Sequence, residues 1–187
     1  MIEIKKGNEP KELLQYRQRD FATYADMPSD VKKKVIEGLL SEQGHLCAYC
    51  MSRIDGGDGK HRATIEHCIP QSVSAEKERL NYKNMVAVCW GNRDAHSNDD
   101  KSCDAKRGSL PLEQQDMKRL NLNCEACRLK ECRLQALRTL HRMINQKYPN
   151  KTVPKKYLQE LLAHYIAQNE NREPYSGIMI AWLSKKV

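Results

Sequence analysis

Aromatic residues and long apolar stretches are scarce in this chain. Only 6% of its 187 residues are aromatic, with a single Phe, and no stretch approaches the roughly 18 apolar residues of a membrane span. The N-terminus, Met1–Lys6, lacks the apolar core of a signal peptide. We therefore expect a cytoplasmic protein that makes no membrane contact, with a core built from Leu, Ile, Val, Met and Tyr.

Other motifs are missing as well. The sequence has no G-x-x-x-x-G-K-[ST] phosphate loop, so any control by a nucleotide would have to come from a partner. No helix-turn-helix, sheet platform or row of stacking aromatic residues is evident, so specificity for a nucleic-acid sequence is not indicated. Internal repeats and low-complexity linkers are absent too, which favours one compact unit.

Basic residues are in excess. Thirty-two Lys and Arg against 24 Asp and Glu give a net charge of +8, with a pI near 9.1. Such an excess favours a polyanionic partner, because Lys and Arg that neutralise phosphates release counterions. A merely soluble basic protein is the alternative that charge alone leaves open.

The residue pattern divides the chain into three segments. Residues 1–44 read as helical, residues 45–112 as cysteine-rich with little regular structure, and residues 113–187 as helical again. Within the middle segment, Arg62–His67 and Met85–Cys89 are short and apolar enough for two strands. We therefore expect an α+β fold, a mainly α-helical chain around a small central core.

Helix boundaries follow from local signals. Ser29 or Asp30 can cap a helix whose apolar residues recur at helical spacing, and Gly44 can end it. A short helix is expected to open at Cys103. In the last segment, one helix should end before Tyr148 and another should begin at Pro154, which suits a first helical turn. A short final helix is expected over residues 178–183.

Eight cysteines are present, and in a reducing cytosol spaced pairs suggest zinc rather than disulfides. Two thiolates two residues apart can reach one tetrahedral ion. The predicted structural zinc site consists of Cys47, Cys50, Cys89 and Cys103. Cys68 reads as a small half-buried side chain.

A second zinc site is not expected at Cys124, Cys127 and Cys132. On an unbroken helix Cys127 and Cys132 would lie about 140° apart, so the three sulfurs would not converge.

The run Thr64–Ser72 contains Glu66 beside His67, followed by Pro70. A carboxylate can hold a metal ion, and a neutral imidazole can take a proton from an attacking water near pH 7. Adjacent residues on a regular strand point to opposite faces, so a twist or break would be needed for both to serve one centre. The pattern predicts a one-metal hydrolytic site.

These motifs resemble a known superfamily. Glu66-His67-Cys68-Ile69-Pro70, then Asn84-Met85, then Cys89, then Cys103-Asp104-Ala105-Lys106 resemble the HNH endonucleases of ββα-metal fold. The runs Ile2–Lys6, Glu12–Arg17 and Leu46–Cys50 are similar to the HNH subunit of Septu-type anti-phage systems, PtuB-like proteins that include retron-associated members. The closer resemblance extends from the N-terminus to about Leu112.

The resemblance implies a role for each motif residue. His67 would be the general base, Asn84 would brace the loop that carries it, and Glu66 would bind a catalytic Mg²⁺ or Mn²⁺. The third motif position, commonly His or Asn, is Asp104 here, and a carboxylate is a suitable ligand for these ions. His96 and Asn92 are the alternatives for that ligand.

The resemblance also implies a substrate and partners. The expected reaction is hydrolysis of nucleic acid, DNA first, with RNA including tRNA also open. Arg62, Lys106 and Arg107 are expected to contact backbone phosphates. The implied partners are an ABC/SMC-like ATPase (PtuA-like) and, in retron systems, a reverse transcriptase with its RNA–DNA product. The alternative is a catalytically silent, zinc-stabilised module that binds nucleic acid or a partner protein.

Overall fold

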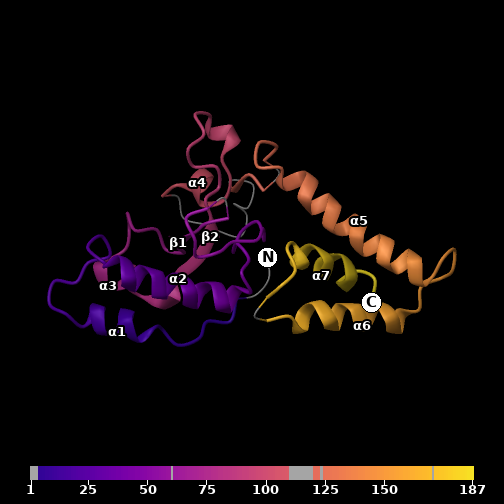
Figure 1. Cartoon of the computed structure of the whole chain (residues 1–187), viewed down its shortest axis with the longest axis horizontal. Coiled ribbons are helices and arrows are strands. Elements are labelled where there is room, and N and C mark those ends of the chain that lie inside the picture. Colours follow the sequence, from indigo (N-terminus) through magenta and orange to yellow (C-terminus); the bar gives the residue numbers. More distant parts are fainter. Residues whose placement is uncertain (1–3, 60, 110–119, 123, 170) are drawn as a thin grey trace.

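The computed structural model describes residues 4–59, 61–109, 120–122, 124–169 and 171–187. In this part of the chain the fold is α+β, with helices around one two-stranded sheet (Figure 1). The elements in chain order are α1 (Lys11–Arg17), α2 (Ser29–Gln43), β1 (Ala63–His67), α3 (Glu76–Arg79), η1 (Tyr82–Asn84), β2 (Met85–Cys89), η2 (Asn98–Asp100), α4 (Cys103–Arg107), α5 (Leu129–Lys147), α6 (Lys155–Ala167) and α7 (Ser176–Ser184).

The two strands form an antiparallel pair in which Ala63 lies opposite Cys89 and His67 opposite Met85. Both strands were predicted, and β1 is one residue shorter than expected. The apolar residues of β2 are buried because α2 and α4 both pack against this strand. The small sheet therefore lies at the centre of the first half of the molecule, between two helices.

Helix α2 confirms the predicted apolar face and the predicted end. Its apolar side chains are buried, and Gly44 follows it with φ +60°, the left-handed conformation that suits glycine. The predicted cap is wrong, because Ser29 is already helical and no side chain caps the first turn after Pro28. At the other end, Gln43 bonds the backbone of β2: its amide donates to the carbonyl of Ala87 at 2.8 Å and accepts from that residue's N–H at 2.7 Å.

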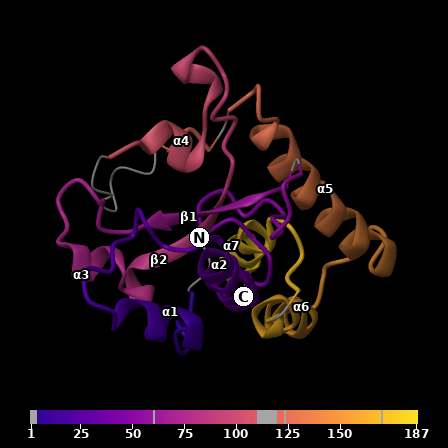
Figure 2. The ribbon, with the colours of Figure 1, turned by 60° about the vertical axis from the view of Figure 1, so that its left-hand side comes forward.

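The C-terminal helices are also where the pattern predicts them, with α6 following Pro154 directly. Helices α5, α6 and α7 pack together beside the sheet (Figures 1 and 2). They enclose an apolar cluster of their own, centred on Leu140, Ile144, Tyr165, Met179 and Leu183. None of the helices in the described residues combines the length and the apolar character needed to cross a membrane.

Several contacts join this helical part to the centre of the molecule. The segment before α7 returns to the loop after α2, where Arg172 N–H donates to the carbonyl of Gly44 and Tyr175 N–H to that of Met51. Leu129, the first residue of α5, packs in the central cluster, whereas Leu140 belongs to the C-terminal one. The two apolar clusters thus divide within α5. The segment boundary expected between residues 112 and 113 lies outside the described residues.

Candidate metal centre and candidate active site

The four predicted cysteines come together in space. Their sulfur atoms all lie within 4.8 Å of one another, with Cys47 3.9 Å from Cys103 and Cys50 3.8 Å from Cys89. A tetrahedral zinc ion with Zn–S bonds of about 2.3 Å would place its sulfurs about 3.8 Å apart. The group therefore fits a metal such as zinc in residue type, number and spacing.

Local structure explains why these thiols converge. Cys47 and Cys50 lie in the turn after α2, in which Cys47 N–H donates to the carbonyl of Ser52 and Met51 N–H to that of Cys47. The last residue of β2 is Cys89, and α4 begins at Cys103. The four thiols thus come from the turn after α2, from the end of β2 and from the start of α4, so a bound ion would join these three parts of the fold.

Gly91 allows the chain to return from β2 to α4. Its φ is +64°, and its carbonyl accepts from Ser102 N–H at 2.9 Å, which closes the base of the loop between them. A Cβ at this position would collide with the carbonyl oxygen of Ser102. Only glycine combines this φ with such a close approach of two backbones.

Glu66 points from β1 towards α4, where it meets Arg107 and Asp104. Arg107 is 2% exposed, and its guanidinium contacts the Glu66 carboxylate, the Tyr49 hydroxyl at 2.9 Å and the carbonyls of His67 and Cys68 at 3.0 and 2.9 Å. The interior position of Arg107 does not fit the expected contact with backbone phosphate. This side chain instead joins α4 to the end of β1.

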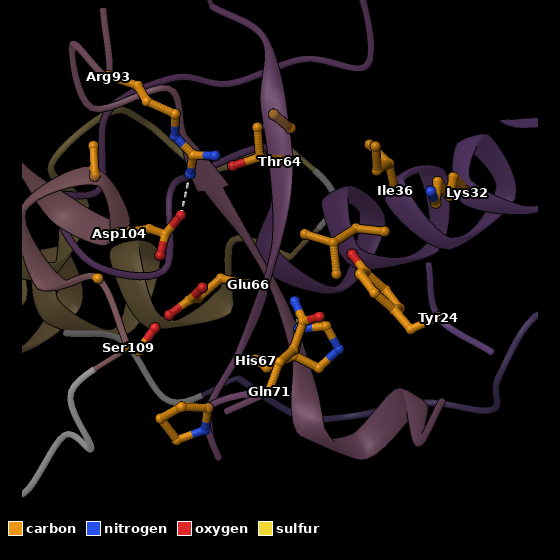
Figure 3. A pocket seen from close by; sticks show the side chains of 15 residues that line it. Tyr24, Lys32, Ile36, Thr64, Glu66, His67, Gln71, Arg93, Asp104 and Ser109 are labelled. Atoms are coloured by element: carbon orange, nitrogen blue, oxygen red, sulfur yellow. Dashed lines mark hydrogen bonds and ion pairs between the residues drawn. The ribbon is translucent and has the colours of Figure 1, made fainter. Parts of the chain in front are cut away.

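Asp104 lies beside Glu66, and both side chains line the cavity (Figure 3). Burial, followed by the neighbouring Asp104 carboxylate, raises the pKa of Glu66 to about 8, although Arg107 acts in the opposite direction. Two neighbouring carboxylates are hard oxygen ligands of the kind that Mg²⁺ and Mn²⁺ prefer. Of the three residues considered for the third ligand, Asp104 lines the cavity, and His96 and Asn92 do not.

His67 is 2% exposed, and both of its ring nitrogens have partners. Nε2 lies 2.9 Å from the backbone carbonyl of Arg79, which can only accept, so Nε2 carries the proton. Nδ1 is then the basic nitrogen, and it receives the side-chain amide of Gln71 at 3.2 Å. Burial lowers the pKa of His67, which keeps the ring neutral at pH 7.

Glu66 and His67 lie on opposite faces of β1, as the alternation of a regular strand requires. Figure 3 shows the Glu66 carboxylate pointing to Asp104 and the imidazole of His67 pointing to Tyr24, whose ring meets it edge-on at 4.5 Å. Consecutive residues 63–67 nevertheless all line one cavity of about 690 Å³. The cavity therefore runs along the edge of β1 opposite β2, which pairs with no other strand in the described residues, and it reaches both faces.

Asn84 lies behind this site and does not line the cavity. Its side-chain oxygen accepts from Ile69 N–H at 2.7 Å, and its amide donates to the carbonyls of Ile69 and Glu78 at 3.2 Å. Its own carbonyl accepts from Cys68 N–H. These bonds tie the residues that follow His67 to the start of β2.

The other expected phosphate ligands lie near the surface. The guanidinium of Arg62 lies 3.3 Å from the ring centroid of Trp90 and 3.8 Å from Asp94. Lys106 donates to Asp99 at 2.9 Å and to the carbonyl of Asn98 at 3.0 Å. Two further basic residues, Lys32 and Arg93, line the cavity.

Tyr49 and Gln71 were not predicted from the sequence as parts of the site, and Arg93 was not predicted to contact Asp104. Tyr49 lies inside the Cys47–Cys50 pair, and its hydroxyl is 3.3 Å from the Glu66 carboxylate. Gln71 follows His67 by four residues outside regular secondary structure, so no periodicity links the two. Arg93 was one basic residue among several until its contact with Asp104 distinguished it.

Cys124, Cys127 and Cys132 do not lie on one unbroken helix, as was assumed when no second zinc site was expected, because α5 begins only at Leu129. Cys124 and Cys127 lie in turns before it, with their sulfurs 3.1 Å apart and with Cys127 N–H 3.4 Å from the Cys124 sulfur. Even so, the described residues contain no other group of three or more ligands as close as the four-cysteine cluster. Cys68 is exposed rather than half-buried.

Comparison with known proteins adds no relative: no protein-family model, no curated protein and no solved structure matches the chain.

Proposed function

We propose that the chain is a metal-dependent nuclease of the HNH type, which hydrolyses phosphodiester bonds of nucleic acid, with DNA as the first choice and RNA second. The observation that carries the proposal is the pair of neighbouring carboxylates, Glu66 and Asp104, on a cavity that also contains the neutral imidazole of His67. A Mg²⁺ or Mn²⁺ ion held by the two carboxylates would supply charge stabilisation at the phosphate and the leaving oxygen. A zinc ion in the four-cysteine cluster would join the end of β2 to the start of α4, the helix that carries Asp104.

His67 acts as the general base through Nδ1. Its Nε2–H bond to the carbonyl of Arg79 fixes the tautomer and the ring plane, as a general base requires. Gln71 covers Nδ1 and is exposed, so one hydrogen bond must break before a water molecule reaches the nitrogen. The scissile phosphate would lie along the edge of β1 opposite β2, because only there do groups from both faces of the strand reach the cavity.

The proposed partners follow from the resemblance to PtuB-like proteins. An ABC/SMC-like ATPase would supply the nucleotide control for which this sequence has no phosphate loop. In a retron-associated system, a reverse transcriptase with its RNA–DNA product would join the complex. The net charge of +8 supports a nucleic-acid substrate.

A second candidate is a silent module that binds nucleic acid or a partner without cleaving. A specific observation favours it: each carboxylate already has an arginine partner, Arg107 on Glu66 and Arg93 on Asp104. Neutralised carboxylates bind a divalent cation less tightly than free ones.

The two candidates differ in metal-dependent cleavage. Plasmid DNA and total RNA are incubated with the zinc-loaded chain, alone and with the proposed ATPase, in Mg²⁺, in Mn²⁺ and in EDTA. We expect cleavage products in Mg²⁺ or in Mn²⁺ and none in EDTA. His67→Asn should abolish these products, because it removes Nδ1. The smaller Asn side chain can be accommodated at this buried position. His61→Asn, at an exposed histidine two residues before β1, is the matched control and should keep wild-type activity.

Zinc content and circular dichroism of the two histidine variants show whether each has folded. Equal cleavage by wild type and His67→Asn would remove His67 from the mechanism. Absence of a metal-dependent product from both substrates, with the ATPase present, would favour the silent module.

A further inference from the structure

Arg93 has a contact that neither the zinc cluster nor the general base requires. Its guanidinium forms an ion pair with the Asp104 carboxylate at the cavity mouth (Figure 3). The same guanidinium lies 5.0 Å from the ring centroid of Trp90. Arg93 therefore touches one of the two carboxylates proposed to hold the catalytic cation, and it does so from the solvent side.

The two arginines of the carboxylate pair differ in freedom. The side chain of Arg107 is 1% exposed and bonds four groups inside the protein, so it cannot leave without unfolding its surroundings. The side chain of Arg93 is 43% exposed, and Asp104 is its only carboxylate partner among the ion pairs of the described residues. Although the Asp104 side chain is only 14% exposed, water can solvate the guanidinium of Arg93, so Arg93 can leave this ion pair at a smaller cost than Arg107 can leave Glu66.

We propose that Arg93 is an electrostatic gate of the catalytic site. Without a divalent cation its guanidinium is paired with the Asp104 carboxylate. When a cation binds the Asp104 oxygens, Arg93 is displaced and contacts a phosphate of the bound nucleic acid. The cation and the guanidinium compete for one carboxylate, whereas the displaced arginine and the cation both attract phosphate. The inference rests on the proposed function, because it assumes that Asp104 is a ligand of the cation.

Trp90 limits where the displaced side chain can go. The indole Nε1–H donates to Asp94 at 2.6 Å, which fixes the ring, and the ring also carries the guanidinium of Arg62 at 3.3 Å. The Arg93 side chain can change rotamer while its guanidinium stays within cation–π distance of the Trp90 ring. Its guanidinium then stays at the cavity mouth, where a phosphate would pass.

The first measurement is the affinity for Mn²⁺, titrated into the zinc-loaded full chain and followed by electron paramagnetic resonance of the free ion. Arg93→Gln removes the competitor and should lower the Kd for Mn²⁺ by about 2- to 5-fold, the range for a partly exposed ion pair. Arg62→Gln is the matched control, because Arg62 lies over the same ring and pairs with Asp94 rather than Asp104. It should leave the Kd unchanged, and Asp104→Asn should raise it.

The second measurement follows the arginine itself. In a Trp182→Phe background, Trp90 is the one remaining tryptophan of the two in the sequence. Saturating Mg²⁺ should change its emission when Arg93 leaves Asp104, and the same titration of Trp182→Phe/Arg93→Gln should show no change. In the presence of Mn²⁺, Arg93→Gln should also reduce the salt dependence of DNA binding by about one phosphate contact.

The outcomes separate the gate from the proposed function. If Asp104→Asn weakens Mn²⁺ binding and Arg93→Gln leaves it unchanged or weaker, the gate is wrong and the carboxylate site remains. If Asp104→Asn has no effect on Mn²⁺ binding, the carboxylate site itself is wrong and the gate falls with it.

Discussion

Arg107 offers the sharpest test of how the site is built. The side chain is buried and bonds Glu66, Tyr49 and the backbone carbonyls of His67 and Cys68 at the end of β1. We consider Arg107→Met, which keeps length and apolar contact but removes the charge and every donor. The variant leaves the Glu66 carboxylate buried beside Asp104 without its cationic partner.

The expected cost follows from that isolated carboxylate. Removing one partner of a buried ion pair costs about 3–5 kcal/mol. Glu66 can relieve its unpaired charge by binding a proton, since its pKa is already raised to about 8 by burial and Asp104, so we take the lower end, about 3 kcal/mol. For a chain of this length each kcal/mol shifts the Tm by about 2–4 °C, which gives a decrease of about 6–12 °C.

The assays are urea and thermal unfolding at a pH above the pKa of Glu66, so that its carboxylate is charged. Both are followed by Trp90 fluorescence in a Trp182→Phe background, so that the signal reports the sheet and α4 rather than the C-terminal helices. Zinc is kept saturating, because a ligand of the folded state adds to the apparent stability. Lys106→Met is the matched control on the same helix. Its partner Asp99 is exposed, so its effect should stay within about 0.5 kcal/mol.

A double variant separates the charge from the other bonds. Glu66→Gln removes the buried negative charge, so Arg107→Met/Glu66→Gln should be about 1–3 kcal/mol more stable than the sum of the two single effects predicts. If Arg107→Met lowers the free energy of unfolding no more than Lys106→Met does, the buried contact between Arg107 and Glu66 does not stabilise the fold as expected. The same conclusion follows if the two single effects simply add.

Two further predictions concern the four-cysteine cluster and the turn that serves it. Cys89→Ser should lower the zinc content measured by atomic absorption and should expose the hairpin to proteolysis, because one thiolate ligand is lost, whereas the exposed Cys68→Ser should retain the wild-type zinc content. Equal zinc content in both would disprove the assignment of Cys89. Gly91→Ala should lower the free energy of unfolding by about 1–3 kcal/mol and weaken zinc retention, because its φ is +64° and a Cβ would collide with Ser102. Gly59 has open space around it, so Gly59→Ala should change the free energy of unfolding by no more than about 0.5 kcal/mol. An unchanged stability of Gly91→Ala would contradict the tight turn.

Local sequence patterns predicted most helices and strands correctly. Both strands, the helix opening at Cys103 and the three C-terminal helices are where spacing and Pro or Gly signals predict them. Hydrophobic periodicity and turn residues act over a few positions, so they can be read without the fold. The predicted helix cap at Ser29 or Asp30 was wrong, because a capping residue identifies a helix start only to within a residue or two.

The environment of the site was predictable only in part. The strand alternation already required Glu66 and His67 to face apart, and the structure keeps that separation while one cavity reaches both. Arg107 was expected to contact phosphate, because nothing in the sequence marks a basic residue at the end of a short helix as buried, yet it is 2% exposed. Its position results from α4 packing on β2, which brings residue 107 next to residue 66.

The composition of the cysteine cluster, and the acidic and imidazole groups at the end of β1, can be predicted from residue type and spacing. Two thiolates with two residues between them, together with a carboxylate beside a histidine, have few other uses. Which charged groups meet depends on the tertiary structure. Ion pairs such as Arg93 with Asp104 and Arg107 with Glu66 join positions 11 and 41 residues apart, and such pairings depend on how helices and strands pack, not on any local pattern.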